Sequence, residues 1–368
     1  MRVLTIFGTR PEAVKMAPVV AALRCRPGVQ ARVLVTAQHR QMLDQVLEIF
    51  DIRPDFDLDI MQENQAPTQV AAEVLVRLRP VLLAERPDWV LVQGDTTSAV
   101  AAAFAACYER ARVGHVEAGL RTYDRQNPFP EEINRVLADH LADLCFAPTE
   151  TARLALIKEN IPAERVHVTG NTVVDALQTI IARAPAPAGA GGHLPELPAG
   201  KRLVLVTAHR RENFGRPLAE ICAALKQLAA RPDVQVVYPV HPNPNVHGPV
   251  NEALGGLPGV WLLPPLDYLD FAQLMSRAYL ILTDSGGIQE EAPGLGVPVL
   301  VMRAVTERPE AIEAGAARLV GADRANIVAQ ASRLLDDPAA HAAMARAVNP
   351  FGDGHAAERI VSLLLSET

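Results

Sequence analysis

Cysteine is scarce in this sequence, with four among 368 residues. No two of them form a C-x-x-C pair, and their spacing to histidine fits no zinc site. The sequence therefore predicts neither a disulfide framework nor a bound metal. Such cysteine usage suits a reducing compartment.

A long hydrophobic run is also missing. The apolar residues near the N-terminus are followed at once by Arg10 and Glu12, so the run is too short for a signal peptide. No stretch approaches the length of a membrane span. We therefore expect a cytoplasmic protein with no membrane partner.

The sequence has no excess of basic residues, and its formal net charge is −7 at pH 7. An acidic chain argues against nucleic acid as a main partner, because the phosphate backbone would be repelled. A local basic pocket for an anionic substrate is compatible with this composition.

The first turn lacks the G-x-G-x-x-G motif of nicotinamide-dependent enzymes. The apolar run at 3–7 is followed instead by G-T-R-P-E. Arg10 in this turn, with Lys15 one helical turn later, is suited to phosphate. The pattern disfavours hydride transfer, and no cofactor is predicted.

Short apolar runs alternate with helical patterns along the whole chain, which indicates an α/β fold with parallel, doubly wound sheets. The length suggests two domains, and the Ala-, Pro- and Gly-rich segment 185–200 is a candidate linker or loop beside their boundary. A cleft between two such sheets is the expected ligand site. The expected strands are residues 3–7, 33–36, 89–92, 113–116, 144–147 and 166–168 in the first half, and 203–207, 234–239, 260–263, 279–283, 297–302 and 317–320 in the second.

Residues 279–298 combine a buried strand, a glycine turn and a helix start. The first amides of a helix have no intrahelical partner and attract anions, and Gly286 and Gly287 let a phosphate approach the backbone. A carboxylate one turn later, Glu290 or Glu291, could accept hydrogen bonds from ribose hydroxyls. The stretch predicts a site for a nucleotide diphosphate, although an ordinary strand-to-helix turn is the alternative.

Charged residues follow several expected strands. Arg10, Asp95 and Glu117 come after strands of the first half, and His209 follows a strand of the second half. The carboxyl ends of parallel strands lie along one edge of a sheet, so these side chains could converge on one cleft.

Some charged residues also fit purely structural interpretations. Asp95 could cap a helix, Glu132 could complement a helix dipole, and Arg121 could be a surface charge. Asp57 and Asp59 form a D-x-D pair like that of some glycosyltransferases. Because no strand is expected before the pair, we interpret it as a solvated loop.

Nine motifs carry a family resemblance: FGTRPEAVKMAP, TAQHRQMLDQV, VQGDTTS, HVEAGLRT, FPEEINR, VTGNTVVDA, TAHRRENFG, TDSGGIQEEAP and TERPEA. In this order they resemble the bacterial non-hydrolysing UDP-N-acetylglucosamine 2-epimerases over nearly the whole chain. The resemblance implies two Rossmann-like domains that face a cleft, similar to GT-B glycosyltransferases. The N-terminal domain would comprise residues 1–170 and 355–368 and carry the sugar and activator side, whereas residues 171–354 would bind UDP.

The implied reaction interconverts UDP-N-acetylglucosamine and UDP-N-acetylmannosamine through loss of UDP and return of UDP to a 2-acetamidoglucal. The family usually forms homodimers, and UDP-N-acetylglucosamine activates several members at a second site. The implied catalytic residues are Asp95, Glu117, Glu131 and His209. The implied substrate-binding residues are Arg10, Lys15, Arg135, Ser285, Gly286, Gly287, Glu291 and Arg308, and the implied activator residues are Gln38, Gln41, Arg211 and His241.

Three other functions share parts of this pattern. A GT-B glycosyltransferase would use the same nucleotide half but would leave the three carboxylates unexplained. A hydrolysing relative would release UDP and N-acetylmannosamine. A regulator that binds the nucleotide sugar without catalysis would have no need of the acid and base residues.

Overall fold

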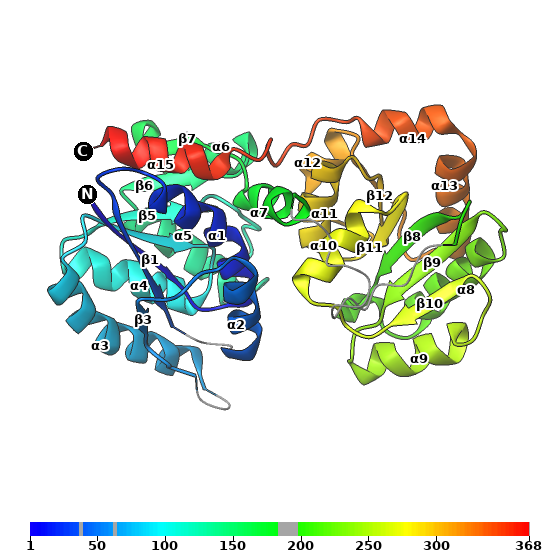
Figure 1. The fold of residues 1–368 in the computed structure, drawn as a ribbon, viewed down its shortest axis with the longest axis horizontal. Helices are drawn as coiled ribbons and strands as arrows, with labels where there is room; N and C mark the ends of the chain where they lie inside the picture. Colours follow the sequence, from blue (N-terminus) through cyan, green and yellow to red (C-terminus); the bar gives the residue numbers. More distant parts are fainter. Residues whose placement is uncertain (37–39, 62–64, 183–197, 368) are drawn as a thin grey trace. The chain divides into compact units, whose positions relative to one another are not determined.

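The computed structural model describes residues 1–36, 40–61, 65–182 and 198–367. The chain forms two compact units, each built around one sheet (Figure 1). Unit 1 comprises residues 1–176 and 351–368, and unit 2 comprises residues 177–350. The domain boundaries expected from the sequence, at 170/171 and 354/355, lie within six residues or fewer of these limits.

Unit 1 contains a seven-stranded parallel sheet in the order β3-β2-β1-β4-β5-β6-β7. The strand order reverses between β1 and β4, which is where doubly wound folds bind ligands. The strands are β1 (Arg2–Phe7), β2 (Gln30–Val35), β3 (Phe56–Asp57), β4 (Trp89–Gln93), β5 (Arg112–Val116), β6 (Leu144–Ala147) and β7 (Val166–Val168).

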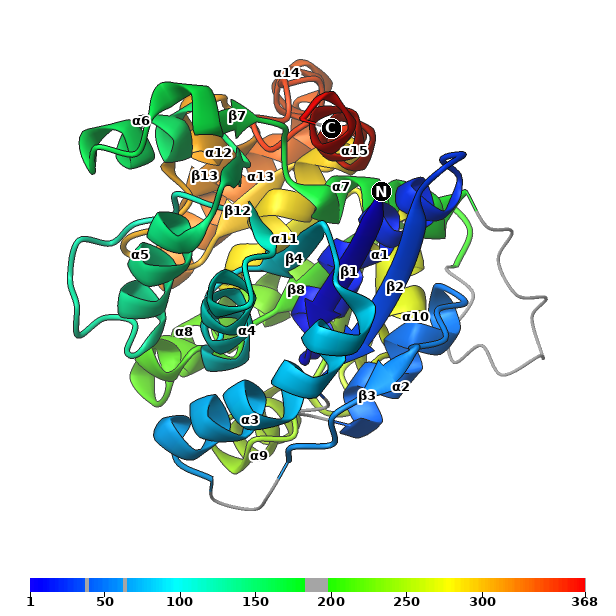
Figure 2. The same cartoon turned by 90° about the vertical axis from the view of Figure 1, so that its left-hand side faces the viewer.

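Helices cover both faces of this sheet. Helices α3, α4 and α5 pack in succession, whereas α1 packs against α2 and the C-terminal helix α15; Figure 2 shows these two sets on opposite sides of the strands. The helices of unit 1 are α1 (Arg10–Arg24), α2 (Arg40–Ile49), α3 (Pro67–Glu85), α4 (Thr97–Tyr108), α5 (Glu131–Leu141), α6 (Glu150–Lys158) and α15 (Ala356–Ser366), with α7 (Thr172–Ile181) running into unit 2.

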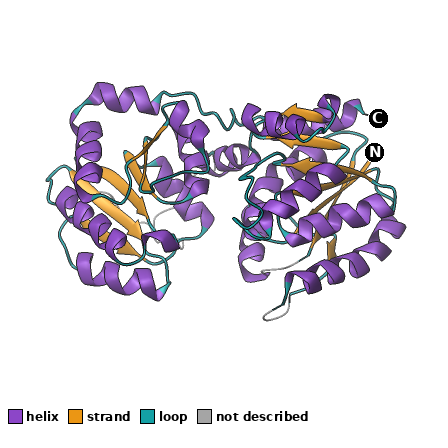
Figure 3. Ribbon diagram, turned by 180° about the vertical axis from the view of Figure 1, so that it is seen from behind, coloured by secondary structure: helices purple, strands orange, loops and turns teal. Residues whose placement is uncertain are grey.

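Unit 2 repeats the plan with a six-stranded parallel sheet in the order β10-β9-β8-β11-β12-β13. Its order reverses between β8 and β11, and helices again lie on both faces (Figure 3). Its strands are β8 (Arg202–Thr207), β9 (Val234–Pro239), β10 (Val260–Leu263), β11 (Leu280–Thr283), β12 (Val299–Val301) and β13 (Ala317–Leu319); its helices are α8 (Arg216–Ala229), α9 (Pro244–Leu254), α10 (Tyr268–Ser276), α11 (Gly286–Glu291), α12 (Pro309–Glu313), α13 (Arg324–Asp336) and α14 (Pro338–Ala345).

Burial explains why the central strands form. Every residue of β4 and β11 is buried, as expected of parallel strands covered on both faces. Each unit has its own apolar core, one around Leu4, Leu34 and Val90 and the other around Val204, Val236 and Leu282. The α/β prediction and its expected strands are confirmed.

Several segments differ from the expectations. Phe56 and Asp57 form the short edge strand β3, so the expectation of no strand before the D-x-D pair was wrong; Asp57 and Asp59 are nevertheless exposed. No helix was predicted at α7, α9, α12 or α14, and α9 contains two prolines. One of them lies at the helix start, where proline costs no hydrogen bond.

None of the helices within these described ranges is long and apolar enough to cross a membrane.

Gly119 tests how tightly the turn after β5 is packed. Its φ is +88°, and an added Cβ would overlap the carbonyl oxygen of Ala152. We expect Gly119→Ala to lower the free energy of unfolding, measured by urea denaturation, by about 2 to 5 kcal/mol, from left-handed strain plus overpacking.

Gly28→Ala is the matched control, because Gly28 has a φ of +80° but nothing within 4 Å of an added Cβ. Strain alone should cost this variant about 1 to 2 kcal/mol. Equal losses in the two variants would show that Ala152 does not restrict the turn.

Candidate functional site

The reversal of strand order in unit 1 brings three predicted site residues to the same edge. Arg10 follows β1, Asp95 follows β4 and Glu117 follows β5, and these strands are direct neighbours in the sheet. Arg10 makes no hydrogen bond or ion pair with another residue of the described ranges. Its guanidinium is therefore available to an anion at this edge.

Glu117 ends β5 in a left-handed conformation with a φ of +66°. Such strain persists only where the surroundings fix the backbone, and it concentrates at functional sites. Lys15 and Gln93 donate hydrogen bonds to its carboxylate, and Asn171 donates a third at 3.1 Å. These donors come from three separate elements and hold a nearly buried carboxylate in one orientation.

Asp95 is held by helix α5 and does not cap α4. The N-cap of α4 is Thr96, whose hydroxyl oxygen accepts from the amide of Ala99 at 3.1 Å. Arg135 donates to the Asp95 carboxylate at 2.8 Å. The helix-cap interpretation of Asp95 is therefore wrong.

The two glutamates that open α5 have different surroundings. Glu132 is 2% exposed and accepts from the amides of Thr122 and Tyr123 and from Arg135, so it has a structural role. The Oε2 atom of Glu131 is buried and has no hydrogen-bond partner among the described residues. A buried acceptor without a donor is costly, which suggests that a ligand supplies the missing partner.

Arg121 is not a surface charge. Its side chain is 2% exposed and forms ion pairs with Asp139 and Glu159. The surface interpretation was wrong because both partners lie far along the sequence.

Glu12 was missed as a site residue. It accepts from the amides of Gly8 and Thr9, both at 2.7 Å, and from the hydroxyl of Thr96 at 2.6 Å. Burial raises the pKa of this carboxyl, and these hydrogen bonds offset part of the rise. Glu12 thus joins the turns that carry Arg10 and Asp95. The T-x-x-E spacing of a capping box was the signal that could have revealed it.

In unit 2, His209 and Asp284 flank the point where the strand order reverses, after β8 and β11. Asp284 is fully buried and accepts from the amides of His209 and Arg210 and from the Asn213 side chain. The His209 ring is 37% exposed, with its Nδ1 3.6 Å from Asp284. Burial lowers the pKa of His209, as do His241 and Arg210, and Asp284 opposes them only in part.

The helix after β11 begins earlier than expected: Ser285 is its N-cap, and Gly286 and Gly287, which were predicted to lie in the turn, are the first two residues of α11. Gly286 and Gly287 have no positive φ, and an added Cβ at either would make only ordinary contacts, the nearest at 3.7 Å. Neither the backbone nor the packing of the described residues therefore requires glycine at these positions.

The two carboxylates of α11 have different partners. Glu290 is buried and pairs with Arg308, whereas Tyr268 donates to Glu291 at 3.3 Å. The carboxylate of Glu290 is thus paired with Arg308, which was predicted to bind substrate. Glu291 is the more accessible of the two.

The structure describes only some of the predicted activator residues. Gln38 lies outside the described residues, as does the side chain of Gln41. Arg211 and His241 are exposed in unit 2, and the His241 ring stacks on His209 with a centroid distance of 5.3 Å.

Each unit offers different chemistry. Unit 1 gathers carboxylates held by cations and amides, which suits proton transfer. Unit 2 offers amides and a histidine at the end of its sheet, which suits an anionic ligand. No group of three or more potential metal ligands occurs in the part of the chain that the structure describes.

A family model described as UDP-N-acetylglucosamine 2-epimerase matches residues 21–365. The UDP-N-acetylglucosamine 2-epimerase of Salmonella typhimurium is 55% identical, with 100% of this chain and 99% of the relative covered. That of Escherichia coli K12 is 54% identical, with 99% and 98% covered.

A solved structure also resembles this chain over its whole length. The UDP-GlcNAc 2-epimerase of Neisseria meningitidis, bound to UDP-GlcNAc, is 45% identical and has a TM-score of 0.88, with both chains covered completely. The match extends over both sheets and over every motif described above. The chain belongs to the UDP-N-acetylglucosamine 2-epimerase family.

Proposed function

We propose that this protein interconverts UDP-N-acetylglucosamine and UDP-N-acetylmannosamine by inverting C2 of the sugar. The main support is the group of Asp95, Glu117 and Glu131 at the carboxyl edge of the unit 1 sheet, in a chain that belongs to this family. Two of these carboxylates are held by cations, and the third has a buried oxygen without a hydrogen-bond partner among the residues that the structure describes.

The proposed route is elimination followed by re-addition. No ketone acidifies the C2 proton, so direct removal and return of that proton would be slow. Loss of the proton together with UDP from C1 gives 2-acetamidoglucal. Return of a proton to the other face of C2 and of UDP to C1 completes the inversion. Such steps need an acid, a base and stabilisation of the departing diphosphate.

The carboxylates of unit 1 would perform the proton transfers. Asp95 and Glu117 would lie nearest C2, and Glu131 would orient or share the proton. Lys15 and Arg135, which pair with Glu117 and Asp95, would hold these carboxylates and support the anionic site.

Unit 2 would bind the nucleotide. His209 would stabilise the leaving diphosphate, and Glu291, beside Tyr268, would bind the ribose. The proposed diphosphate contacts are Arg10, Ser285, Gly286, Gly287 and Arg308.

Two further features of the family are proposed for this chain. Arg211 and His241, with Gln38 and Gln41, would bind UDP-N-acetylglucosamine as an activator. A homodimer is supported by exposed apolar side chains on α3, α4 and α5, among them Val76, Tyr108 and Leu137.

Epimerisation predicts a defined result in heavy water. Purified protein mixed with UDP-N-acetylglucosamine alone should produce UDP-N-acetylmannosamine, with deuterium at C2 of both sugars, because the C2–H bond breaks reversibly. Proton NMR follows both changes. Glu117→Gln should slow them by about 10²- to 10⁴-fold, the usual contribution of one acid or base.

Other outcomes separate the competing functions. Free N-acetylmannosamine with UDP would indicate the hydrolysing reaction. Unchanged and undeuterated substrate would favour a glycosyltransferase or a regulator. A heavy oxygen isotope between C1 and the β-phosphate should spread to the other β-phosphate oxygens if UDP departs, and epimerisation without this exchange would exclude elimination.

Gly287 predicts how closely the diphosphate approaches the backbone. Gly287→Ala should leave the thermal unfolding midpoint nearly unchanged, because an added Cβ has room, but should weaken UDP binding about tenfold or more by calorimetry. Gly248→Ala is the control, since Gly248 lies in α9 with nothing within 4 Å of an added Cβ. Unchanged UDP affinity in Gly287→Ala would remove this residue from the proposed site.

His209 predicts a pH dependence of UDP binding. Its lowered pKa leaves the ring neutral at neutral pH, and a bound diphosphate would favour the charged ring. UDP affinity should therefore rise as the pH falls from about 8 to about 5.5. The phosphate of UDP itself titrates at about pH 6 and also changes the affinity. The contribution of His209 is therefore the difference between the pH profiles of UDP affinity for wild type and for His209→Asn. Parallel pH profiles would exclude a charged His209 in the complex.

A further inference from the structure

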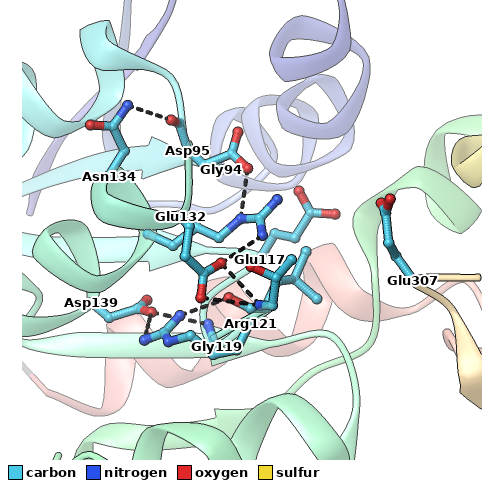
Figure 4. A network of polar contacts seen from close by, with 12 residues as sticks. Gly94, Asp95, Glu117, Gly119, Arg121, Glu132, Asn134, Asp139 and Glu307 are labelled. Atoms are coloured by element: carbon cyan, nitrogen blue, oxygen red, sulfur yellow. Dashed lines mark hydrogen bonds and ion pairs between the residues drawn. The ribbon is translucent and has the colours of Figure 1, made fainter. Parts of the chain in front are cut away.

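A buried ionic network lies below the turns that follow β4 and β5. Its centre is Asp139 of α5, which is fully buried. Its Oδ1 is 2.6 Å from Nδ1 of His115, and its Oδ2 is 2.7 Å from Arg121 and accepts from the Gly119 amide at 3.2 Å. Figure 4 shows Asp139 and Arg121 directed toward each other. Neither His115 nor Asp139 is used in the reaction proposed above.

Both ring nitrogens of His115 face acceptors. Nε2 lies 2.8 Å from the carbonyl oxygen of Gly94, which can only accept, so Nε2 carries a proton. Nδ1 faces Asp139, whose carboxylate already accepts from Gly119 and pairs with Arg121. A carboxylate with these partners is ionised, so Nδ1 also donates and the ring is an imidazolium.

The charges around the ring agree with this assignment. Asp139 faces it from α5, and Arg121 faces it from the loop after β5; Glu159, beyond α6, pairs with Arg121. Cys145 of β6 donates to the backbone of Asp139 and stays a neutral thiol, because burial raises its pKa. An imidazolium makes the network neutral overall, whereas a neutral ring would leave one uncompensated buried negative charge.

The pKa directions of the two partners are consistent with each other. Burial alone would lower the pKa of His115, but Asp139 and the Gly94 carbonyl raise it overall against the opposing charge of Arg121. Burial alone would raise the pKa of Asp139, but His115 and Arg121 lower it overall.

The network reaches both turns that carry proposed catalytic carboxylates. His115 holds the carbonyl of Gly94, the residue before Asp95, and Gly119 lies two residues after Glu117. Glu117 holds a strained positive φ, and Gly94 and Gly119 are residues of high backbone freedom, so these turns need external anchors to stay in one conformation. Asp139 itself lies on α5, the helix that carries Glu131 and Arg135.

We propose that Asp139, a permanently protonated His115 and Arg121 are positioning residues that fix the turns of Asp95 and Glu117 to helix α5. The kinetic part of this inference rests on the proposed function, whereas the protonation of His115 does not. The network would fix the positions of Asp95, Glu117 and Glu131 relative to one another without touching the substrate.

The protonation state can be tested on the full-length wild type without substrate. Nitrogen-15 NMR of histidine-labelled protein should give one ring, assigned with His115→Gln, that shows the imidazolium pattern at about pH 7.5, where an ordinary histidine is neutral. In Asp139→Asn this ring should be neutral at the same pH, because loss of the carboxylate charge lowers the pKa of the imidazole. A neutral His115 in wild type at about pH 7.5 would overturn the proposal.

The positioning role can be tested with two substitutions of similar polarity. The amide nitrogen of glutamine reaches about as far as Nε2, whereas that of asparagine reaches only as far as Nδ1. His115→Asn therefore loses the donor to Gly94 and should lower kcat about 10- to 100-fold, while His115→Gln keeps it and should lose less than about tenfold. KM should change less than about threefold in both, because substrate contacts stay in place.

Failure of the proposed function and failure of the positioning role give different results. If wild type does not epimerise the substrate, the proposed function fails, but the NMR result still decides the state of His115. If wild type is active and both variants, checked for folding by their thermal midpoints, keep the wild-type kcat, the positioning role fails alone. Equal losses of kcat in the two variants would also contradict it, since they would not depend on the Gly94 hydrogen bond.

Discussion

The structure depends on the burial of parallel strands on both faces. Strands such as β4 and β11 have no solvent contact, so a charged side chain first finds room in the turn that follows each strand. All strands in a sheet run the same way, and these turns therefore gather along one edge. The reversal of strand order then leaves two neighbouring turns whose helices lie on opposite faces, which opens space for a ligand.

The two units use this constraint differently. In unit 1 the edge carries carboxylates, and each needs a partner because the edge is largely buried. Lys15 and Arg135 supply it for Glu117 and Asp95, and His115 and Arg121 supply it for Asp139 one layer deeper. In unit 2 the buried Asp284 accepts backbone amides and fixes the turn of His209. One edge is thus suited to proton transfer and the other to an anion.

Much of the fold follows from local patterns. Twelve apolar runs were predicted as strands and all are present, because a buried parallel strand needs a continuous apolar run. The thirteenth strand, β3, has two residues and forms by pairing with Leu34 and Val35, which a local pattern does not record. Helix α9 was among the helices not predicted, and its first residue is a proline, a residue type that occurs both at helix starts and in loops.

The sequence by itself determined the order of strands and helices, the turns that bear charge, and the family. Only the tertiary structure decided which charges act together. Lys15 and Glu117 are 102 positions apart, and Asp95 and Arg135 are 40 apart. Glu131 and Glu132 are adjacent and identical, yet Glu132 is held by two amides and an arginine, while Glu131 has a buried oxygen with no partner in the described part of the chain. Local preferences act over a few residues, whereas an ion pair depends on the strand order that brings its two ends together.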